Sequence, residues 1–238
     1  MKIILTGYSS PQDRREAFDR HADGFIIKPV RIDSFVRTPR QHEGRLAVVA
    51  VGASAGGPAA LERVFSRLPH QMPAALVVSQ HMPNGFTKQF SERLAAVSDL
   101  QVREAQQDDV VQAGTAFITP GGQNMKIAKD GRIQLKKAEQ TPSPSIDIMM
   151  KSVADAYSAK CVGVLMSGML NDGVIGMKAI RDHGGVTIAQ DESSSVVFGM
   201  NKAAIEAGAV DVVAHVSIIA DRIVNAVSGF SAGKNTVE

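Results

Sequence analysis

The chain lacks tryptophan, has one cysteine among its 238 residues and carries a formal net charge of only +2. A single cysteine excludes a disulfide framework, and the apolar run around Cys161 (CVGVLM) favours a buried, inert thiol. The small net charge comes without a basic stripe and interleaved aromatic residues, which argues against a nucleic-acid-binding surface. We therefore expect no nucleic acid among the partners of this protein.

Long hydrophobic runs are also missing. The longest uncharged stretch, residues 46–61, is interrupted by glycines and poor in bulky side chains, so it does not predict a membrane span. The apolar run near the N-terminus (IIL) is too short for a signal peptide. These absences predict a cytoplasmic protein without membrane insertion.

Buried strands alternate with amphipathic helices along most of the chain. After the first strand, Leu61, Val64, Phe65 and Leu68 follow the i, i+3, i+4, i+7 spacing of a helix face. This alternation predicts an α/β fold with a doubly wound, mostly parallel sheet. The predicted strands of the main domain cover residues 45–52, 74–80, 161–168 and 184–190.

Residues 116–138 (AFITPGGQNMKIAKDGRIQLKKA) break this alternation. They contain two turn signals, PGG and KDG, between alternating runs. Such a pattern predicts an antiparallel β-ribbon inserted into the parallel fold.

The two ends of the chain differ from its middle. Residues 1–37 read as strand, helix, strand and short helix, a βαβα unit that buries too little surface to be stable alone. The polar residues 38–44 (TPRQHEG) predict a linker. The main domain is then expected over residues 45–228, followed by a flexible tail over residues 229–238.

A Gly-rich turn follows the first strand of the main domain, where residues 48–58 read VVAVGASAGGP. Gly52, Ser54 and Gly56 fit G-x-S-x-G, a motif that exposes a nucleophilic serine at a sharp strand-to-helix turn. A phosphate loop is the alternative, but neither G-x-G-x-x-G nor G-K-[ST] is present. An anion site at the helix N-terminus and a plain structural turn stay open, because G-x-S-x-G often occurs by chance.

A nucleophilic serine needs a base and a group that orients the base. His81 ends the second strand (SQHM) and Asp172 follows the third (SGMLNDG), although loop histidines and helix N-caps are the ordinary roles of such residues. The carboxyl ends of parallel strands share one edge of the sheet. Ser54, His81 and Asp172 are therefore predicted to converge there, as in a Ser-His-Asp triad.

With these residues placed, the chain resembles the catalytic domain of the chemotaxis protein-glutamate methylesterases (CheB type). The similarity runs from about Val48 to Val227. Five segments carry it in order: GASAGG, QHMPNGFT, PSPSID, GMLNDG and TIAQDESSSVVFGM.

The resemblance implies hydrolysis of glutamyl methyl esters on the cytoplasmic helices of chemoreceptors, with deamidation of some glutamines as a second activity. It assigns the nucleophile to Ser54, the base to His81 and the orienting carboxylate to Asp172. The backbone amides of Ala55 and Met169 are the expected oxyanion donors. Chemotaxis signalling proteins are further implied partners, and the implied chemistry requires neither a cofactor nor a metal.

Three residues depart from the pattern of the family. Leu170 in GMLNDG stands where a glycine is usual, and it is expected to shift the Asp172 loop or narrow the site. Asn124 in TPGGQNM replaces a frequent histidine, which puts a contact with substrate in doubt. Ala55 stands where other members of the family carry threonine, and alanine is a common variant at that position.

Residues 1–37 resemble the last part of a response-regulator receiver. LTGY and GFIIKP match its fourth and fifth strands, with Thr6 at the hydroxyl switch position and Lys28 at the phosphate-pairing position. The acidic pair and the phosphoacceptor aspartate would belong to earlier strands that this sequence does not include. We expect such a fragment to leave a strand edge that must be covered or frayed.

Two functions of other classes compete with an active methylesterase. Leu170 and the partial receiver favour a catalytically weak module that binds receptors or regulators. The Gly-rich turn alone favours a nucleotide-binding domain.

Overall fold

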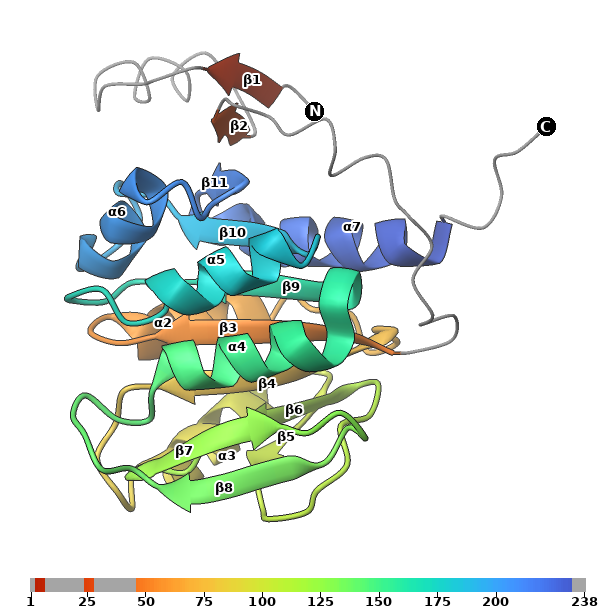
Figure 1. The fold of residues 1–238 in the computed structure, drawn as a ribbon, viewed down its shortest axis with the longest axis vertical. Coiled ribbons are helices and arrows are strands. Elements are labelled where there is room, and N and C mark those ends of the chain that lie inside the picture. Colours follow the sequence, from red (N-terminus) through yellow and green to blue (C-terminus); the bar gives the residue numbers. More distant parts are fainter. Residues whose placement is uncertain (1–2, 7–23, 28–45, 233–238) are drawn as a thin grey trace.

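The computed structural model describes residues 3–6, 24–27 and 46–232, and their main feature is a single large β-sheet (Figure 1). Within these residues the sheet has nine strands in the order β1-β2-β11-β10-β9-β3-β4-β6-β5. All neighbours in it are parallel except β11 and β2. The strands are β1 (Ile3–Thr6), β2 (Gly24–Ile27), β3 (Ala47–Ala53), β4 (Ala74–Gln80), β5 (Gln101–Glu104), β6 (Thr115–Ile118), β9 (Cys161–Leu165), β10 (Val186–Gln190) and β11 (Val212–Ala214).

Helices cover both faces of this sheet, and α4 and α5 are seen in front of it in Figure 1. The α-helices are α2 (Gly57–Phe65), α3 (Thr87–Val97), α4 (Ile146–Tyr157), α5 (Val174–Asp182), α6 (Gly199–Glu206) and α7 (Ile219–Ala232). Two short 3₁₀ helices, η2 (Ser158–Lys160) and η3 (Val216–Ile218), complete the described helices.

The sheet separates two hydrophobic cores. Along β3, Val48 and Ala50 join the core formed with α4, α5 and α6, whereas Val49 and Val51 join the core formed with α2, α3 and α7. Every residue of β3 and of β4 is buried, as expected for strands covered on both faces. The predicted doubly wound α/β class, with a mostly parallel sheet, is confirmed.

The predicted antiparallel ribbon is shorter than the sequence indicated. Within the predicted ribbon, only β7 (Gln123–Ile127) and β8 (Ile133–Lys137) pair antiparallel, around a turn with Gly131 at φ 87°. Residues 116–118, at the start of the predicted ribbon, instead belong to β6 (Thr115–Ile118), a parallel strand between β4 and β5. All four residues of β6 are buried, so this segment needs cover on both faces and cannot belong to a half-exposed ribbon.

The described parts of residues 1–37 extend the main sheet. β1 pairs with β2 in parallel, and β2 pairs with β11 in antiparallel register, so β11 covers one edge of this pair. Thr6 is the last residue of β1. Lys28, the two predicted helices of this unit and the predicted linker lie outside the described residues.

At the other end, α7 continues to Ala232 and so includes the first residues of the predicted tail. Residues 233–238 lie outside the described residues. In the part of the chain that the structure describes, no helix has the length and apolar character needed to cross a membrane.

Candidate active site

The centre of the sheet brings the predicted site residues to one edge. β3 lies between β9 and β4, and the last residue of β3, Ala53, pairs with the last residue of β4, Gln80. Ser54 and His81 therefore leave the sheet at the same level. Asp172 reaches the same edge from the loop between β9 and α5, in residues 166–173.

The Ser54 turn, residues 54–56, is held through its backbone. The amide of Ser54 donates to the carbonyl of Ser167 (2.9 Å), and the amide of Gly57 donates to the carbonyl of Ser54 (2.8 Å). The hydroxyl of Ser167 donates to the carbonyl of Ala55 at 2.7 Å. Gly56 has φ 78°, and a Cβ atom there would lie 2.5 Å from Cβ of Val196, so only glycine fits.

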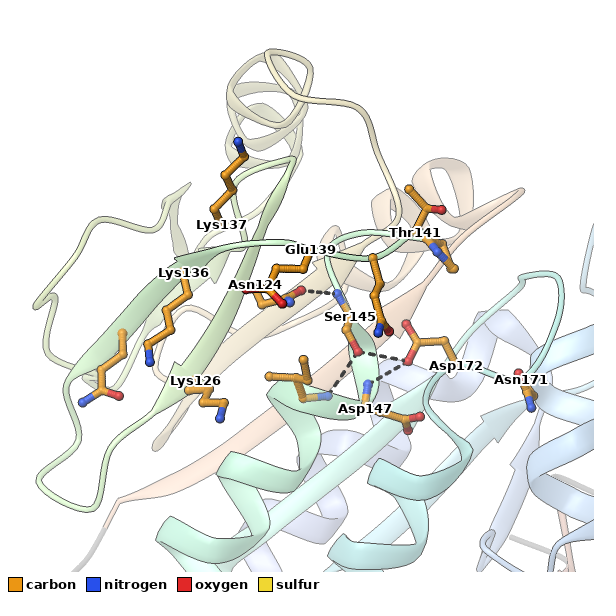
Figure 2. A pocket seen from close by; sticks show the side chains of 14 residues that line it. Asn124, Lys126, Lys136, Lys137, Glu139, Thr141, Ser145, Asp147, Asn171 and Asp172 are labelled. Carbon is orange, nitrogen blue, oxygen red and sulfur yellow. Dashed lines mark hydrogen bonds between the residues drawn. The ribbon is translucent and has the colours of Figure 1, made fainter.

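Asp172 is held through its own carboxylate (Figure 2). Its Oδ1 accepts from the amide of Asp147 at 2.9 Å, as Figure 2 shows. Its Oδ2 accepts from the amide of Ile146 at 2.8 Å. The hydroxyl of Ser145, the N-cap of α4, is 3.4 Å from Oδ1. Asp172 thus satisfies free amides at the start of α4, whereas the N-cap residue of α5, the next helix in the chain, is Gly173 and provides no side-chain cap.

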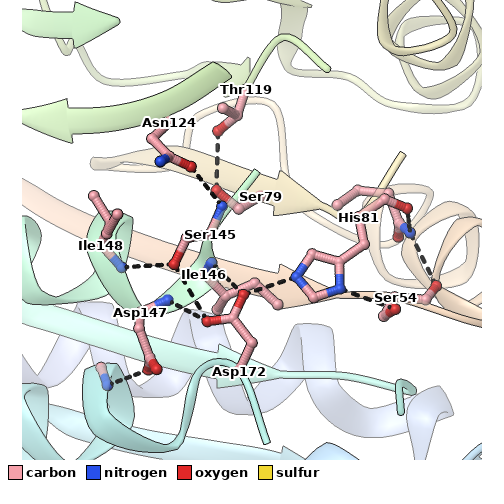
Figure 3. A network of polar contacts seen from close by, with 12 residues as sticks. Ser54, Ser79, His81, Thr119, Asn124, Ser145, Ile146, Asp147, Ile148 and Asp172 are labelled. Atoms are coloured by element: carbon pink, nitrogen blue, oxygen red, sulfur yellow. Dashed lines mark hydrogen bonds and ion pairs between the residues drawn. The ribbon is translucent and has the colours of Figure 1, made fainter. Parts of the chain in front are cut away.

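Ser54, His81 and Asp172 form one chain of hydrogen bonds (Figure 3). His81 Nδ1 lies 3.1 Å from Ser54 Oγ, and His81 Nε2 lies 2.8 Å from Asp172 Oδ2. The carboxylate accepts only, so Nε2 carries a proton and Nδ1 is free to accept from the serine hydroxyl. The ring thus faces the serine with the opposite nitrogen from the protease arrangement, where Nε2 does so.

The environment keeps the Asp172 carboxylate ionised. Burial raises the pKa of Asp172, but hydrogen bonds from His81 and from the amides of Asp147 and Ile146 outweigh burial, and the net shift is downward. The side chains of His81 and Asp172 are only 9% and 14% exposed, so water competes weakly for their hydrogen bond. An ionised, fixed carboxylate can orient the imidazole and stabilise its cationic form.

The neighbouring Asp147 has the opposite shift. Burial and the nearby carboxylate of Asp172 raise the pKa of Asp147, although the amide of Gly176 donates to Asp147 Oδ1 at 2.7 Å. Both carboxyl groups also line a cavity of 510 Å³ between α4 and the β7–β8 ribbon (Figure 2). Neither Ser54 nor His81 lines this cavity, so it borders the hydrogen-bonded chain only on the Asp172 side.

Asn124 and Leu170, two of the three departures from the family pattern, are both described by the structure. Asn124, on β7, accepts from the amide of Ser145 at 2.8 Å through Oδ1, and so supports the start of α4. Leu170 has a positive φ of 66° and is 65% exposed. A glycine is favoured at that backbone conformation, which accounts for the usual residue at this position.

The two predicted oxyanion donors lie beside Ser54. Within the described residues, the backbone amides of Ala55 and Met169 make no hydrogen bond, so both can donate to a ligand. Ala55 follows Ser54 directly. Met169 follows Gly168, where an added Cβ atom would lie 2.8 Å from Cβ of Ser54.

Three supporting residues are not evident from the sequence. Gln80, Ser145 and Ser167 bond to the backbone or side chains of the residues just described. PSPSID resembles a family segment, but its residues do not by themselves predict the helix that begins in it, and the role of Ser145 depends on that helix. No cluster of three or more metal-ligating side chains occurs in the described part of the chain.

Comparison with known proteins agrees with this geometry. A family profile described as CheB methylesterase matches residues 49–223. The chain belongs to the CheB methylesterase family. The match includes every residue of the hydrogen-bonded chain just described.

Three curated relatives carry the name protein-glutamate methylesterase/protein-glutamine glutaminase. The chain is 38% identical to the Lawsonia intracellularis protein over 84% of its own length and 58% of the relative. It is 44% identical to the Archaeoglobus fulgidus protein (74% and 52% of the two lengths) and 46% identical to protein 3 of Geobacter sulfurreducens (76% and 50%). The chain thus spans about half the length of these relatives.

A solved structure is similar as well. The Thermotoga maritima CheB methylesterase catalytic domain superposes with a TM-score of 0.73 at 35% sequence identity. The match covers 76% of this chain and 98% of that domain, so the fold of an entire catalytic domain is present.

Proposed function

We propose that this chain is a serine hydrolase that demethylates glutamyl methyl esters of chemoreceptors. The hydrogen-bonded chain from Ser54 through His81 to Asp172 carries the proposal, because it supplies a nucleophile, a base and an orienting carboxylate in contact. The names of the relatives support the substrate class. Deamidation of receptor glutamines is proposed as a second activity of the same residues.

In the first half of the reaction, Ser54 Oγ attacks the ester carbonyl carbon while His81 Nδ1 takes the hydroxyl proton. The resulting oxyanion is stabilised by the amides of Ala55 and Met169. Its collapse breaks the bond to the methoxy oxygen, which receives the proton from His81 and leaves as methanol. An acyl-enzyme ester between the glutamyl side chain and Ser54 is left.

The second half regenerates the enzyme. A water molecule gives its proton to His81 Nδ1 and attacks the acyl-enzyme carbonyl. Collapse of the second tetrahedral intermediate breaks the bond to Ser54 Oγ, which recovers the proton from His81. The receptor side chain is released as a glutamate carboxylate. With a glutamine substrate the same steps release ammonia in place of methanol.

The proposed partners are the methylated cytoplasmic helices of chemoreceptors, together with chemotaxis signalling proteins. Because the methyl esters lie on cytoplasmic helices, the cytoplasm is the proposed site of action. Thr6 and Lys28 are proposed remnants of a receiver switch in the part of the chain that precedes the esterase domain.

The direct test is the Ser54→Ala variant. Methanol release from methylated receptor should fall by at least about 10⁴-fold, because the nucleophile is lost while the oxyanion donors and binding surfaces stay. A fluorophosphonate should label wild-type protein at Ser54 and should not label the variant. Unfolding in urea should be nearly unchanged, since among the described residues the hydroxyl has a hydrogen bond only with His81.

Ser66→Ala is a matched control, because Ser66 is exposed and its hydroxyl donates, within the part of the chain that the structure describes, only to the carbonyl of Arg63. This variant should keep wild-type labelling and methanol release. Methanol release that survives in Ser54→Ala would show that another residue performs the chemistry.

A further inference from the structure

Gln80 lies between the nucleophile and the base and touches the backbone of both. It is the last residue of β4 and is 2% exposed. Its Nε2 donates to the carbonyl of Ser54 at 2.9 Å and to the carbonyl of His81 at 3.1 Å. One carboxamide therefore ties together the two loops whose side chains must meet.

The other end of this carboxamide has no partner. Oε1 of Gln80 is buried and makes no hydrogen bond within the described residues. The opposite orientation of the amide would place Oε1 against two carbonyl oxygens, so the NH₂ group must face them. Gly57 leaves just enough room, because a Cβ atom there would lie 2.2 Å from Oε1.

A buried oxygen without a partner destabilises the fold, and an apolar side chain of the same size would avoid that loss. What glutamine adds over such a side chain is its pair of N–H donors. Both are aimed at the site, one at Ser54 and the other at His81. The unpartnered oxygen lowers stability, whereas the two donors contact the site, so glutamine at this position serves the reaction and not the stability of the fold.

Gln190 provides the contrast. It is the last residue of β10 and is also fully buried. Its Oε1 accepts from the amide of Ser167 (2.9 Å) and its Nε2 donates to the carbonyl of Ser194 (2.7 Å). Both ends of this carboxamide are satisfied, as in an ordinary structural role.

We infer that Gln80 is a positioning residue, which sets the separation and direction between Ser54 Oγ and His81 Nδ1. The inference rests on the proposed hydrolase function, because it concerns the same nucleophile and base. Gln80 contacts no reacting atom, and its effect passes through the two backbone carbonyls. Loss of its donors removes the shared partner of these two carbonyls, and the bond from the His81 amide to the Ala53 carbonyl (3.0 Å) is left to hold the loops together.

Two substitutions test this role, with fluorophosphonate labelling of Ser54 as a readout that needs no receptor. Gln80→Leu keeps the volume and removes both donors. Its kcat and its labelling rate should fall by about 10- to 100-fold, the effect of a small misplacement of reacting groups, with KM changed by less than about threefold. Its stability in urea should stay close to that of the wild type, because the unpartnered oxygen is removed as well.

Gln80→Glu gives a signature that a purely structural role would not produce. The introduced carboxyl can donate only when protonated, and burial beside two carbonyl oxygens keeps it protonated to high pH. The wild type has no ionisable group at position 80, so this position should cause no fall in its rate toward high pH. The rate of the variant should fall toward high pH as the introduced carboxyl ionises.

Gln190→Leu is the matched control. It should lose more stability than Gln80→Leu, and its pH profile should keep the wild-type shape. Wild-type kcat in Gln80→Leu, or a Gln80→Glu profile of wild-type shape, would overturn the positioning role alone. Wild-type protein that is labelled at Ser54 but releases no methanol would overturn the proposed substrate and leave this role supported if Gln80→Leu labels slowly. Absence of labelling in the wild type would overturn both.

Discussion

The Ser54 turn and the Asp172 loop are both strand-to-helix connections at the same edge of the sheet, yet they are held in different ways. The Ser54 turn (residues 54–56) is short, contains Gly56 at φ 78° and is fixed by backbone hydrogen bonds to Ser167 and Gly57. The Asp172 loop (residues 166–173) is longer and has Leu170 at φ 66°. The end of this loop that carries Asp172 is fixed because the Asp172 carboxylate accepts hydrogen bonds from two amides of α4.

This difference separates two ways to place a reactive group. Ser54, the proposed nucleophile, depends on the conformation of its backbone, so changes of shape in its turn should be the harmful ones. Asp172, the proposed orienting carboxylate, depends on its own charge and on the amides of a helix elsewhere in the chain. Its loop should therefore tolerate changes of shape and respond to changes of charge.

The largest expected effect is that of Asp172→Asn, which changes the charge of the loop and keeps its shape. An amide cannot accept from His81 and from two helix amides at once, because one of its ends only donates. We expect kcat to fall by about 10⁴-fold, as for the corresponding change in the protease triad. Methanol release and the rate of fluorophosphonate labelling measure this loss.

Ser145→Ala serves as the control, because it removes the side-chain cap of α4 and leaves Asp172 bound to the helix amides. It should destabilise the protein by about 1 kcal/mol, the usual effect of a lost N-cap, and lower kcat less than about tenfold. Equal activity losses in the two variants would mean that the cap, not the carboxylate charge, is what the reaction needs.

Gly56→Ala should be the most harmful change of shape in the Ser54 turn. The positive φ costs about 1–2 kcal/mol for a residue with a Cβ atom. A Cβ atom 2.5 Å from Val196 and 2.7 Å from Ser167 Oγ adds overpacking of about 1–3 kcal/mol. We therefore expect a loss of about 2–5 kcal/mol in the free energy of unfolding, measured in urea.

Gly208→Ala isolates the contribution of the backbone. Gly208 has φ 64°, and nothing lies within 4 Å of a Cβ atom built there. The control should lose only the strain of about 1–2 kcal/mol. If the two alanine variants were equally stable, the close packing around Gly56 would have no energetic weight.

How much of this comparison can be predicted from the sequence depends on the range of the contacts. The Ser54 turn is encoded locally, and G-x-S-x-G after a buried run predicts its place before a helix. The parallel edge that joins Ser54, His81 and Asp172 also follows from strand order. The hydrogen bonds that hold Asp172 cannot be predicted in this way, because the amides of Ile146 and Asp147 belong to a helix that the sequence pattern did not predict.

The ribbon and Leu170 show the same limit. Residues 116–118 resemble ribbon sequence, but only the buried sheet shows that β6 pairs with β4 and β5. Leu170 departs from the family pattern in the sequence, and the physical reason is visible only as its positive φ. Local conformations can be predicted where one motif specifies them, whereas contacts between distant segments need the fold.

Asp147→Asn tests how a negative charge at the start of α4 affects the free energy of unfolding. The raised pKa of Asp147 means that its contribution to stability is present below the ordinary aspartate pKa of about 3.9 and is lost as pH rises through the folded-state value. The amide oxygen of the variant can still accept from Gly176. We therefore expect the variant to match the wild type near pH 3.5 and to exceed its stability at pH 7, by less than the loss at Gly56.

The lowered pKa of Asp172 has the opposite effect on the pH dependence of stability. The contribution of Asp172 to stability is present above about pH 3.9 and is lost as pH falls through the folded-state pKa. Urea unfolding between pH 3.5 and 8 separates the two groups. Asp99→Asn is the control, because Asp99 is exposed and its side chain makes no hydrogen bond or ion pair in the described part of the chain. A pH-independent gain in Asp147→Asn would contradict this account.

The smallest expected effect is that of Leu170→Gly, which tests whether the Asp172 loop tolerates a change of shape. Relief of the positive φ should stabilise the protein by about 1–2 kcal/mol, and the greater freedom of glycine in the unfolded chain should offset about 0.5–1 kcal/mol of that gain. Little burial is lost, because Leu170 is 65% exposed. The net gain is about 0.5 kcal/mol, or a rise of about 1–2 °C in Tm.

Met169→Gly is the matched control, since Met169 is 56% exposed in the same loop but has no positive φ, and it should be destabilised. The activity of Leu170→Gly should stay within about threefold of the wild type, because Asp172 is held by α4 and not by the shape of its loop. A tenfold rise in kcat would instead show that Leu170 displaces Asp172, and that the natural chain is the catalytically weak module that its sequence left open.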